Sequence, residues 1–297
     1  MNQDSVIIIG ASGLTGHSLL RTMQRLHMNV VGTYANHSRR GLRQLDITDT
    51  SQVRDCLREL RPKTIYLTAA LTFVDYCEDH PEDAVKRNVD GPRQIAQEAT
   101  RLGAKLVFYS TDYVFDGRNG PYDEEAAPAP LSVYGRTKLA GEQAIGEICA
   151  DSLVIRTTVV YGWDRETINF AMQVYERVKS GAEMTIPSDQ IGNPTLAEYL
   201  AETSLGLVQR GTTGVVNVVG KDLVPRSEFA KALVKVFGGN PELVIPITTA
   251  SLKQKAARPL RGGLRTEKLA RLLGKEPISI EESLERLRSR WQADIQG

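Results

Sequence analysis

Tyr134 and Lys138 stand four positions apart in the segment Ser132-Val133-Tyr134-Gly135-Arg136-Thr137-Lys138. On a helix, this spacing puts both side chains on one face, about one turn apart. A tyrosine phenol, with a reference pKa of about 10, is a poor acid–base catalyst near neutral pH, but a neighbouring ammonium favours phenolate and lowers that pKa. The pair could therefore give a proton to a carbonyl oxygen. A lone Tyr-x-x-x-Lys pair more often consists of exposed side chains without a catalytic role. A catalytic role here therefore needs support from other residues of the chain.

Hydroxyl groups follow a second apolar run. Ser110-Thr111-Asp112 comes directly after Lys105-Leu106-Val107-Phe108-Tyr109, which is expected to be a strand. Ligands bind at the carboxyl ends of parallel strands, so we expect a hydroxyl of this segment, Ser110 or Thr111, to donate a hydrogen bond to a substrate carbonyl beside Tyr134. The alternative for Ser110 and Thr111 is simple turn capping.

A glycine-rich turn supplies the support. The apolar run Ser5-Val6-Ile7-Ile8-Ile9 opens into Gly10-Ala11-Ser12-Gly13-Leu14-Thr15-Gly16 and then into a helical pattern. A strand, a glycine turn and a helix form the arrangement that holds a pyrophosphate at a helix N-terminus. The spacing Gly-x-x-Gly-x-x-Gly differs from the Gly-x-Gly-x-x-Gly fingerprint, and the alternative is a turn that uses glycine for close packing. The expected cofactor-binding residues here are Gly10, Ser12, Gly13, Leu14 and Gly16.

The choice of nicotinamide cofactor depends on the end of the strand expected over 30–34. An acidic residue there would bind the adenosine ribose and select NAD, but the segment that follows contains no Asp or Glu before Asp46. Guanidinium groups match phosphate geometry, so this segment favours NADPH over NADH, unless it is only a solvated basic loop. The expected contacts are Tyr34, Asn36, Arg39 and Arg40, with Asp46 and Ile47 beside the adenine. The alternative for Asp46 is a cap on the helix that starts near Thr50.

Apolar runs alternate with helical patterns through the first half of the chain. Strands are expected over 5–9, 30–34, 64–68, 105–109 and 152–156, with helices over about 50–60 and 82–102 and around Tyr134. This rhythm predicts an α/β protein with a doubly wound parallel sheet (a Rossmann fold) and a smaller C-terminal α/β substrate lobe. The expected dinucleotide-binding domain covers 1–165, and the segment 194–222, with a strand over 215–219, returns to it. The substrate lobe then covers 166–297 and is discontinuous, with helices near 167–180, 226–238, 265–273 and 280–291.

Composition excludes several classes of protein. The 297 residues carry 37 Lys and Arg against 36 Asp and Glu, a net charge of +1, which gives no electrostatic case for binding nucleic acid or an anionic membrane. No apolar run is long enough to span a bilayer, and the three cysteines show no paired spacing. We therefore expect a cytoplasmic protein that acts on a small molecule, with a homodimer as one open possibility. The four histidines show no metal-binding spacing, so no metal site is expected.

Taken together, these segments resemble the extended short-chain dehydrogenase/reductases, and more narrowly the dTDP-4-dehydrorhamnose reductase group. The resemblance covers the glycine turn, Ser110-Thr111-Asp112-Tyr113-Val114-Phe115, Tyr134 to Glu142 and Asp189-Gln190-Ile191-Gly192-Asn193-Pro194-Thr195. It implies that Thr111, Tyr134 and Lys138 are catalytic, and that Ala69 and Ala70 line the nicotinamide side. It also implies that Tyr113 and Asn169 face the substrate.

The same resemblance places Arg258, in Ala257-Arg258-Pro259, on the substrate side. The predicted function is NADPH-dependent reduction of the 4-keto group of a nucleotide-activated deoxy sugar. Two alternatives stay open. One is an NADP-binding regulatory subunit, similar to the β subunit of methionine adenosyltransferase. The other is a reductase of another small carbonyl compound.

Overall fold

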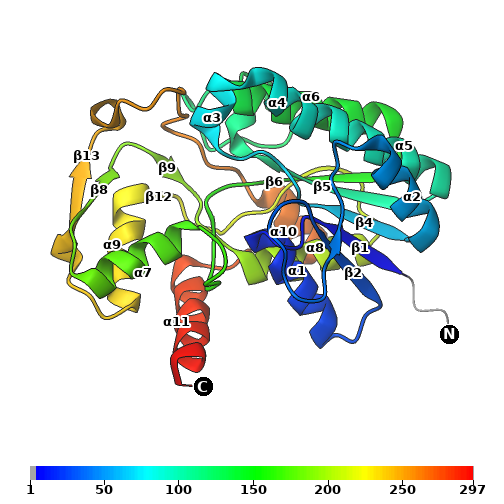
Figure 1. Cartoon of the computed structure of the whole chain (residues 1–297). Helices are drawn as coiled ribbons and strands as arrows, with labels where there is room; N and C mark the ends of the chain where they lie inside the picture. Colours follow the sequence, from blue (N-terminus) through cyan, green and yellow to red (C-terminus); the bar gives the residue numbers. More distant parts are fainter. Residues whose placement is uncertain (1–4, 297) are drawn as a thin grey trace.

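A seven-stranded sheet forms the centre of the molecule in the computed structural model, which describes residues 5–296 (Figure 1). Its strands lie in the order β11-β6-β5-β4-β1-β2-β3, and every neighbouring pair is parallel. This confirms the doubly wound α/β fold that the sequence predicts. The strands are β1 (Val6–Ile9), β2 (Val30–Tyr34), β3 (Arg43–Gln44), β4 (Thr64–Leu67), β5 (Lys105–Thr111), β6 (Ser152–Thr157) and β11 (Gly214–Asn217).

Helices cover both faces of this sheet, because side chains alternate along each strand. In β1, Val6 and Ile8 join one core cluster, and Ile7 and Ile9 join the other. The first cluster is covered by α1 (Leu14–Arg25) and α8 (Ala197–Gln209), with α10 (Glu267–Leu273) beside β11. The second is covered by α2 (Thr50–Leu60), α5 (Gly91–Leu102) and α6 (Val133–Ile148). Both faces of the sheet are therefore apolar, and its polar residues lie at the strand ends.

The helix expected over 82–102 is interrupted. The chain forms α3 (Val74–Asp79) and α4 (Pro81–Val85), then a π-helical turn over Lys86–Asp90, and only then α5. The π turn contains the fully buried Asn88, whose side chain accepts a hydrogen bond from the Leu71 backbone amide and donates to the Leu71 carbonyl oxygen. Asn88 also donates to the hydroxyl of Thr137 on α6, at 3.2 Å. The interruption thus ties the loop after β4 to the helix that carries Tyr134 and Lys138.

A smaller group of elements lies beside the carboxyl ends of the strands (Figure 1). It contains α7 (Phe170–Ser180), α9 (Arg226–Val236) and α11 (Ile280–Gln296). Three short strand pairs complete it: β8 (Met184–Pro187) with β13 (Val244–Ile247), β9 (Ile191–Gly192) with β12 (Val224–Pro225), and β7 (Val160–Tyr161) with β10 (Thr195–Leu196).

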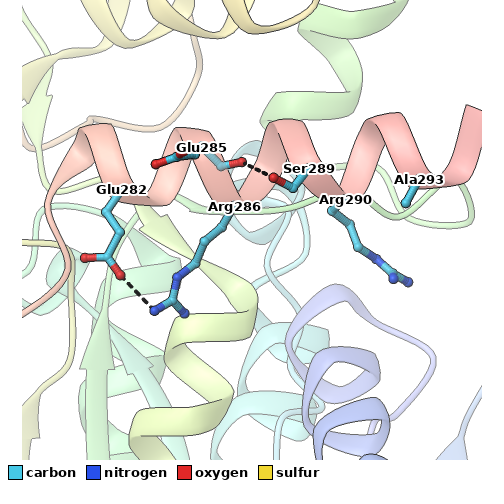
Figure 2. A pocket seen from close by; sticks show the side chains of 6 residues that line it. All are labelled: Glu282, Glu285, Arg286, Ser289, Arg290 and Ala293. Atoms are coloured by element: carbon cyan, nitrogen blue, oxygen red, sulfur yellow. Dashed lines mark hydrogen bonds and ion pairs between the residues drawn. The ribbon is translucent and has the colours of Figure 1, made fainter.

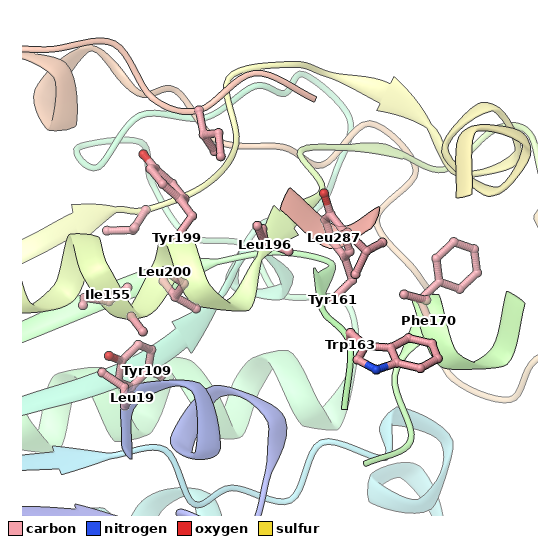
Figure 3. Close-up of a cluster of buried hydrophobic side chains, with 14 of the residues drawn as sticks. Leu19, Tyr109, Ile155, Tyr161, Trp163, Phe170, Leu196, Tyr199, Leu200 and Leu287 are labelled. Atoms are coloured by element: carbon pink, nitrogen blue, oxygen red, sulfur yellow. The ribbon is translucent and has the colours of Figure 1, made fainter. Parts of the chain in front are cut away.

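One hydrophobic core joins this lobe to the sheet. The cluster that contains Leu19 and Ile155 continues through Leu200 to Phe170 and Leu287 (Figure 3). Between residues 5 and 296, no helix is both long enough and apolar enough to cross a membrane.

Candidate active site

A cavity of about 1050 Å³ opens between the carboxyl ends of the sheet strands and the smaller lobe. It brings together segments that are more than 200 residues apart, from the glycine turn after β1 to the start of α9. Most of the residues expected from the sequence line it: Gly10, Ser12, Gly13, Leu14, Gly16, Asn36, Arg39, Asp46, Ile47, Ala69, Ala70, Thr111, Tyr113, Tyr134, Lys138 and Asn169.

Three expected residues do not line this cavity. Tyr34 ends β2 and Arg40 is exposed. Arg258 lies to one side, where its guanidinium pairs with Asp75 at 3.0 Å and donates to the Ala256 carbonyl oxygen at 2.9 Å. The chain therefore presents Pro259 to the cavity in place of Arg258.

The glycine turn is shaped by close backbone approaches. Gly10 has a φ of +96°, and a Cβ there would lie 2.6 Å from the Ala69 backbone nitrogen. A Cβ on Gly16 would lie 2.3 Å from the Gly10 carbonyl oxygen. Helix α1 begins after Gly13 with no side-chain cap, and the amides of a helix's first turn have no intrahelical partner. This end of the cavity therefore offers hydrogen-bond donors and the positive end of a helix dipole to an anion.

The side chain of Lys138 is held against β5. Its Nζ donates a 2.7 Å hydrogen bond to the Tyr109 carbonyl oxygen and lies 3.9 Å from the centroid of the Phe108 ring. Its residue exposure is 2%, and burial lowers the pKa of the Lys138 ammonium to about 7, while the carboxylate of Glu142 acts to raise it. Glu142 itself is buried in an ion pair with Arg156 at 2.7 Å.

Tyr134 lies one turn before Lys138 at the start of α6. This helix is capped by Ser132, whose hydroxyl accepts a hydrogen bond from the Gly135 amide at 3.2 Å. Burial raises the pKa of the Tyr134 phenol, and a hydrogen bond with Thr111 opposes that rise. The structure thus brings Thr111, at the end of β5, to the Tyr134 hydroxyl.

Tyr113 and Asp112 extend the site beyond these three residues. The rings of Tyr113 and Tyr134 meet edge to face with centroids 5.5 Å apart. Burial raises the pKa of Asp112 to about 6, against hydrogen bonds from Thr111 and Thr158, and raises the pKa of Tyr113 to about 12. Asp112 accepts from the Thr111 hydroxyl at 3.2 Å, so it helps to orient that hydroxyl.

Arg39 enters the cavity as part of a charged cluster. Its Nη2 lies 3.1 Å from a carboxylate oxygen of Asp164, and its Nε lies 3.4 Å from Glu166. Asp164 also contacts the ring Nδ1 of His17 at 2.9 Å. Burial raises the pKa of Asp164, but the hydrogen bond with His17 and other contacts lower it overall. Asp164 therefore holds Arg39 against α1, next to the glycine turn.

Two expected polar residues make local contacts. The side-chain oxygen of Asp46 accepts from the amide and the hydroxyl of Thr48, both at 2.9 Å, and Asp49 is the residue that caps α2. Asn169 caps α7, where its side-chain oxygen accepts from the Ala171 amide at 3.1 Å. Both residues still line the cavity.

Orphaned polar atoms test whether these residues suit a nicotinamide cofactor. The hydroxyls of Ser110 and Thr157 are buried in the cavity wall, and neither they nor the Nη1 of Arg39 have a hydrogen-bond partner among residues 5–296. Buried polar groups are normally satisfied. An uncapped helix start, an unused guanidinium nitrogen beside the end of β2 and two free hydroxyls at the ends of β5 and β6 fit a dinucleotide laid across the strand ends.

Sequence reasoning missed Arg226, at the start of α9. Its guanidinium lies 4.4 Å from the Phe170 ring centroid and lines the cavity. It is an isolated cation between a short strand and a helix, and no local spacing marks it. Val159 also lines the cavity, with a φ of +44°, a strained conformation for a β-branched residue.

A second hollow lies on the outer face of α11 (Figure 2). Its lining side chains all come from that one helix, and Arg286 pairs there with Glu282 at 2.8 Å. Arg286 also pairs with Glu202 of α8 at 3.1 Å, so its guanidinium is already neutralised, and among the described residues no set of groups converges there on a ligand.

The match to a family model decides the relationship. Residues 4–292 match the RmlD substrate binding domain. The chain belongs to this family. It is 35% identical to the probable low-salt glycan biosynthesis reductase Agl14 of Haloferax volcanii over 286 residues, covering 93% of this chain and 95% of that protein.

Other similar proteins carry different names. The chain is 31% identical to methionine adenosyltransferase 2 subunit beta of Danio rerio, covering 94% of this chain and 86% of that protein. Among solved structures, it resembles a dTDP-4-dehydrorhamnose reductase from Bacillus anthracis in complex with NADP, with a TM-score of 0.89 and 32% identity over 97% of this chain and 99% of that one. These similarities confirm the resemblance to the dTDP-4-dehydrorhamnose reductase group.

Proposed function

We propose that this protein is an NADPH-dependent reductase of the 4-keto group of a nucleotide-activated deoxy sugar. The observation that carries the proposal is the meeting of Thr111, Tyr134 and Lys138 in the same cavity as the glycine turn. The similarity to a reductase solved with NADP supports the cofactor, and the orphaned hydroxyls and guanidinium nitrogen support its placement.

The reaction follows from the positions of these side chains. NADPH, when bound, supplies the hydride that reduces the carbonyl carbon. Tyr134 gives its phenolic proton to the carbonyl oxygen, and the Thr111 hydroxyl, once turned from Asp112, donates a hydrogen bond that orients this oxygen and stabilises its developing charge. The resulting Tyr134 phenolate is stabilised by the Lys138 ammonium and takes a proton back from solvent after the product leaves.

The preference for NADPH rests on Arg39. It lines the cavity near the end of β2, and its Nη1 has no hydrogen-bond partner in the part of the chain that the structure describes. A 2′-phosphate there would accept from that nitrogen and would compete with Asp164 for the guanidinium. NADH lacks this phosphate, so it gains nothing from Arg39.

Kinetics with a panel of carbonyl compounds test the proposal. Purified protein is mixed with NADPH and either dTDP-4-dehydrorhamnose, other 4-keto sugar nucleotides or simple ketones, and the loss of NADPH absorbance is followed. We expect turnover with a keto sugar nucleotide and none with the simple ketones. Turnover only with simple ketones would show that the substrate is a simple carbonyl compound and not a sugar nucleotide.

The similarity to methionine adenosyltransferase 2 subunit beta supports a second candidate, a regulatory subunit that binds NADP. Under that function the cavity would hold NADP but reduce no sugar nucleotide. Mixing the protein with a methionine adenosyltransferase catalytic subunit, with and without NADP, separates the two. A complex that changes synthetase kinetics, together with no reductase activity across the panel, would favour the regulatory role.

A further inference from the structure

Arg226 is a cation without a counter-ion at the lobe side of the cavity. It begins α9, where its backbone amide donates to the Gln190 carbonyl oxygen at 2.8 Å and fixes the chain. Its guanidinium lies over the Phe170 ring and lines the cavity. Within residues 5–296, no carboxylate forms an ion pair with Arg226, and the charged or titratable groups that act on it are Tyr113 and Arg258.

The neighbouring cation is already neutralised. Arg258 pairs with Asp75 at 3.0 Å and has a side-chain exposure of only 9%. Arg226 therefore carries the unbalanced positive charge of this corner, and burial lowers its pKa below the usual value for an arginine. Leaving a guanidinium partly desolvated without an acceptor costs free energy, so the corner is built for an anion that arrives from outside the chain.

The geometry points to Arg226 as the residue that binds the diphosphate of the substrate nucleotide. This inference rests on the proposed function and deepens it. Planar guanidinium groups bind phosphate oxygens with two parallel hydrogen bonds. Stacking on Phe170 leaves the edge of the guanidinium, which carries its N–H groups, available to such oxygens.

The position relative to Tyr134 suits this assignment. Tyr113 and Arg226 line the same cavity, and the ring of Tyr113 meets that of Tyr134 with centroids 5.5 Å apart. Tyr113 is thus the spacer between the proton donor and the anion corner. In a 4-keto sugar nucleotide, the sugar ring separates the carbonyl carbon from the phosphate on C1, so the sugar would lie along Tyr113 with its two ends at Tyr134 and Arg226.

Binding measurements with fragments of the substrate test the assignment. Thymidine diphosphate, uridine diphosphate and the two nucleosides are titrated calorimetrically into protein saturated with NADP⁺. The variants are Arg226→Gln, Arg226→Lys and, as a control on the same helix, Lys231→Ala, whose lysine pairs locally with Glu228. We expect Arg226→Gln to weaken diphosphate binding by roughly 10- to 100-fold, with nucleoside and NADP⁺ binding unchanged. Arg226→Lys should recover part of the loss, and Lys231→Ala should show none.

Several outcomes would overturn the assignment. One is a wild-type protein that binds the diphosphates no more tightly than the nucleosides. Another is an Arg226→Gln variant that melts at the wild-type temperature and keeps full diphosphate affinity. The inference also fails separately from the proposed function: if the wild type reduces a keto sugar nucleotide and Arg226→Gln leaves KM unchanged, the reductase stands and the anion is bound elsewhere.

Discussion

The ammonium of Lys138 donates a 2.7 Å hydrogen bond to the backbone carbonyl oxygen of Tyr109. This contact fixes the Lys138 side chain against β5, one turn of α6 from Tyr134. It also places the charge in a site where burial lowers its pKa to about 7. Lys138 therefore serves the site at some cost to the stability of the cofactor-free protein.

That cost predicts a pH dependence of stability. The unfolded chain keeps the Lys138 proton up to the ordinary lysine pKa of about 10.4, whereas the folded chain releases it near pH 7. Between these values the unfolded state binds more protons, so the free energy of unfolding rises with pH, by about 1.4 kcal/mol per pH unit at most. Urea unfolding without cofactor should show the wild type gaining on Lys138→Met from pH 7 to pH 9. A constant difference would mean that Lys138 stays charged in the fold.

Tyr134→Phe should abolish most turnover and leave NADPH binding intact, because the change removes only the proton donor. Loss of one general acid costs roughly 10²–10⁴-fold in rate. Single-turnover kinetics with a keto sugar nucleotide, and a fluorescence titration with NADPH, measure the two effects separately. Near-normal turnover would remove Tyr134 from the mechanism.

Arg39→Ala should weaken NADPH binding more than NADH binding, because only NADPH carries the 2′-phosphate. A hydrogen bond to a charged group contributes roughly 1.5–3 kcal/mol, or about 10- to 100-fold in Kd. Arg40→Ala is the matched comparison, since Arg40 is exposed and does not line the cavity, and it should do less. Equal losses for both cofactors, or a wild-type preference for NADH, would contradict the assignment.

Breaking the buried ion pair between Arg156 and Glu142 should lower the free energy of unfolding strongly. Replacing both residues with apolar ones should lower it much less. Arg156→Met leaves the Glu142 carboxylate buried without its partner and should destabilise the fold by roughly 3–5 kcal/mol. The double variant Arg156→Met/Glu142→Met should recover much of this, because it removes both charges. Denaturant unfolding of the wild type, both single variants and the double variant gives the coupling free energy. No recovery would show that Arg156 stabilises mainly through its contacts with Phe115 and the Glu124 carbonyl oxygen.

The part of the site that sequence predicts is the part encoded by local spacing. Gly10, Thr111 and Tyr134 each lie at an element boundary that apolar runs and capping residues mark, and the parallel sheet then gathers the strand ends at one edge. The fold follows from the same alternation. The helix expected over 82–102 was predicted as continuous because a π turn leaves no signature in hydrophobic periodicity.

The remaining features depend on contacts between distant segments. Asp75 forms an ion pair with Arg258, which lies 183 residues later in the chain. Asp164 forms one with Arg39, which lies far earlier in the chain. In the sequence, nothing distinguishes Arg226 from the other lysines and arginines of the chain. Its role emerges only because the folded chain places it over the Phe170 ring in the cavity that Tyr113 also lines.

The single core that joins Leu19 on α1 to Leu287 on α11 couples the melting of the two ends of the chain (Figure 3). Calorimetric and van't Hoff enthalpies of unfolding should then agree, as they do for one cooperative unit. A nucleotide bound only at the glycine turn would raise the temperature of the whole transition, α11 included. By the same reasoning, cutting the chain near residue 165 would expose apolar faces on both fragments, and neither piece should remain monomeric in solution.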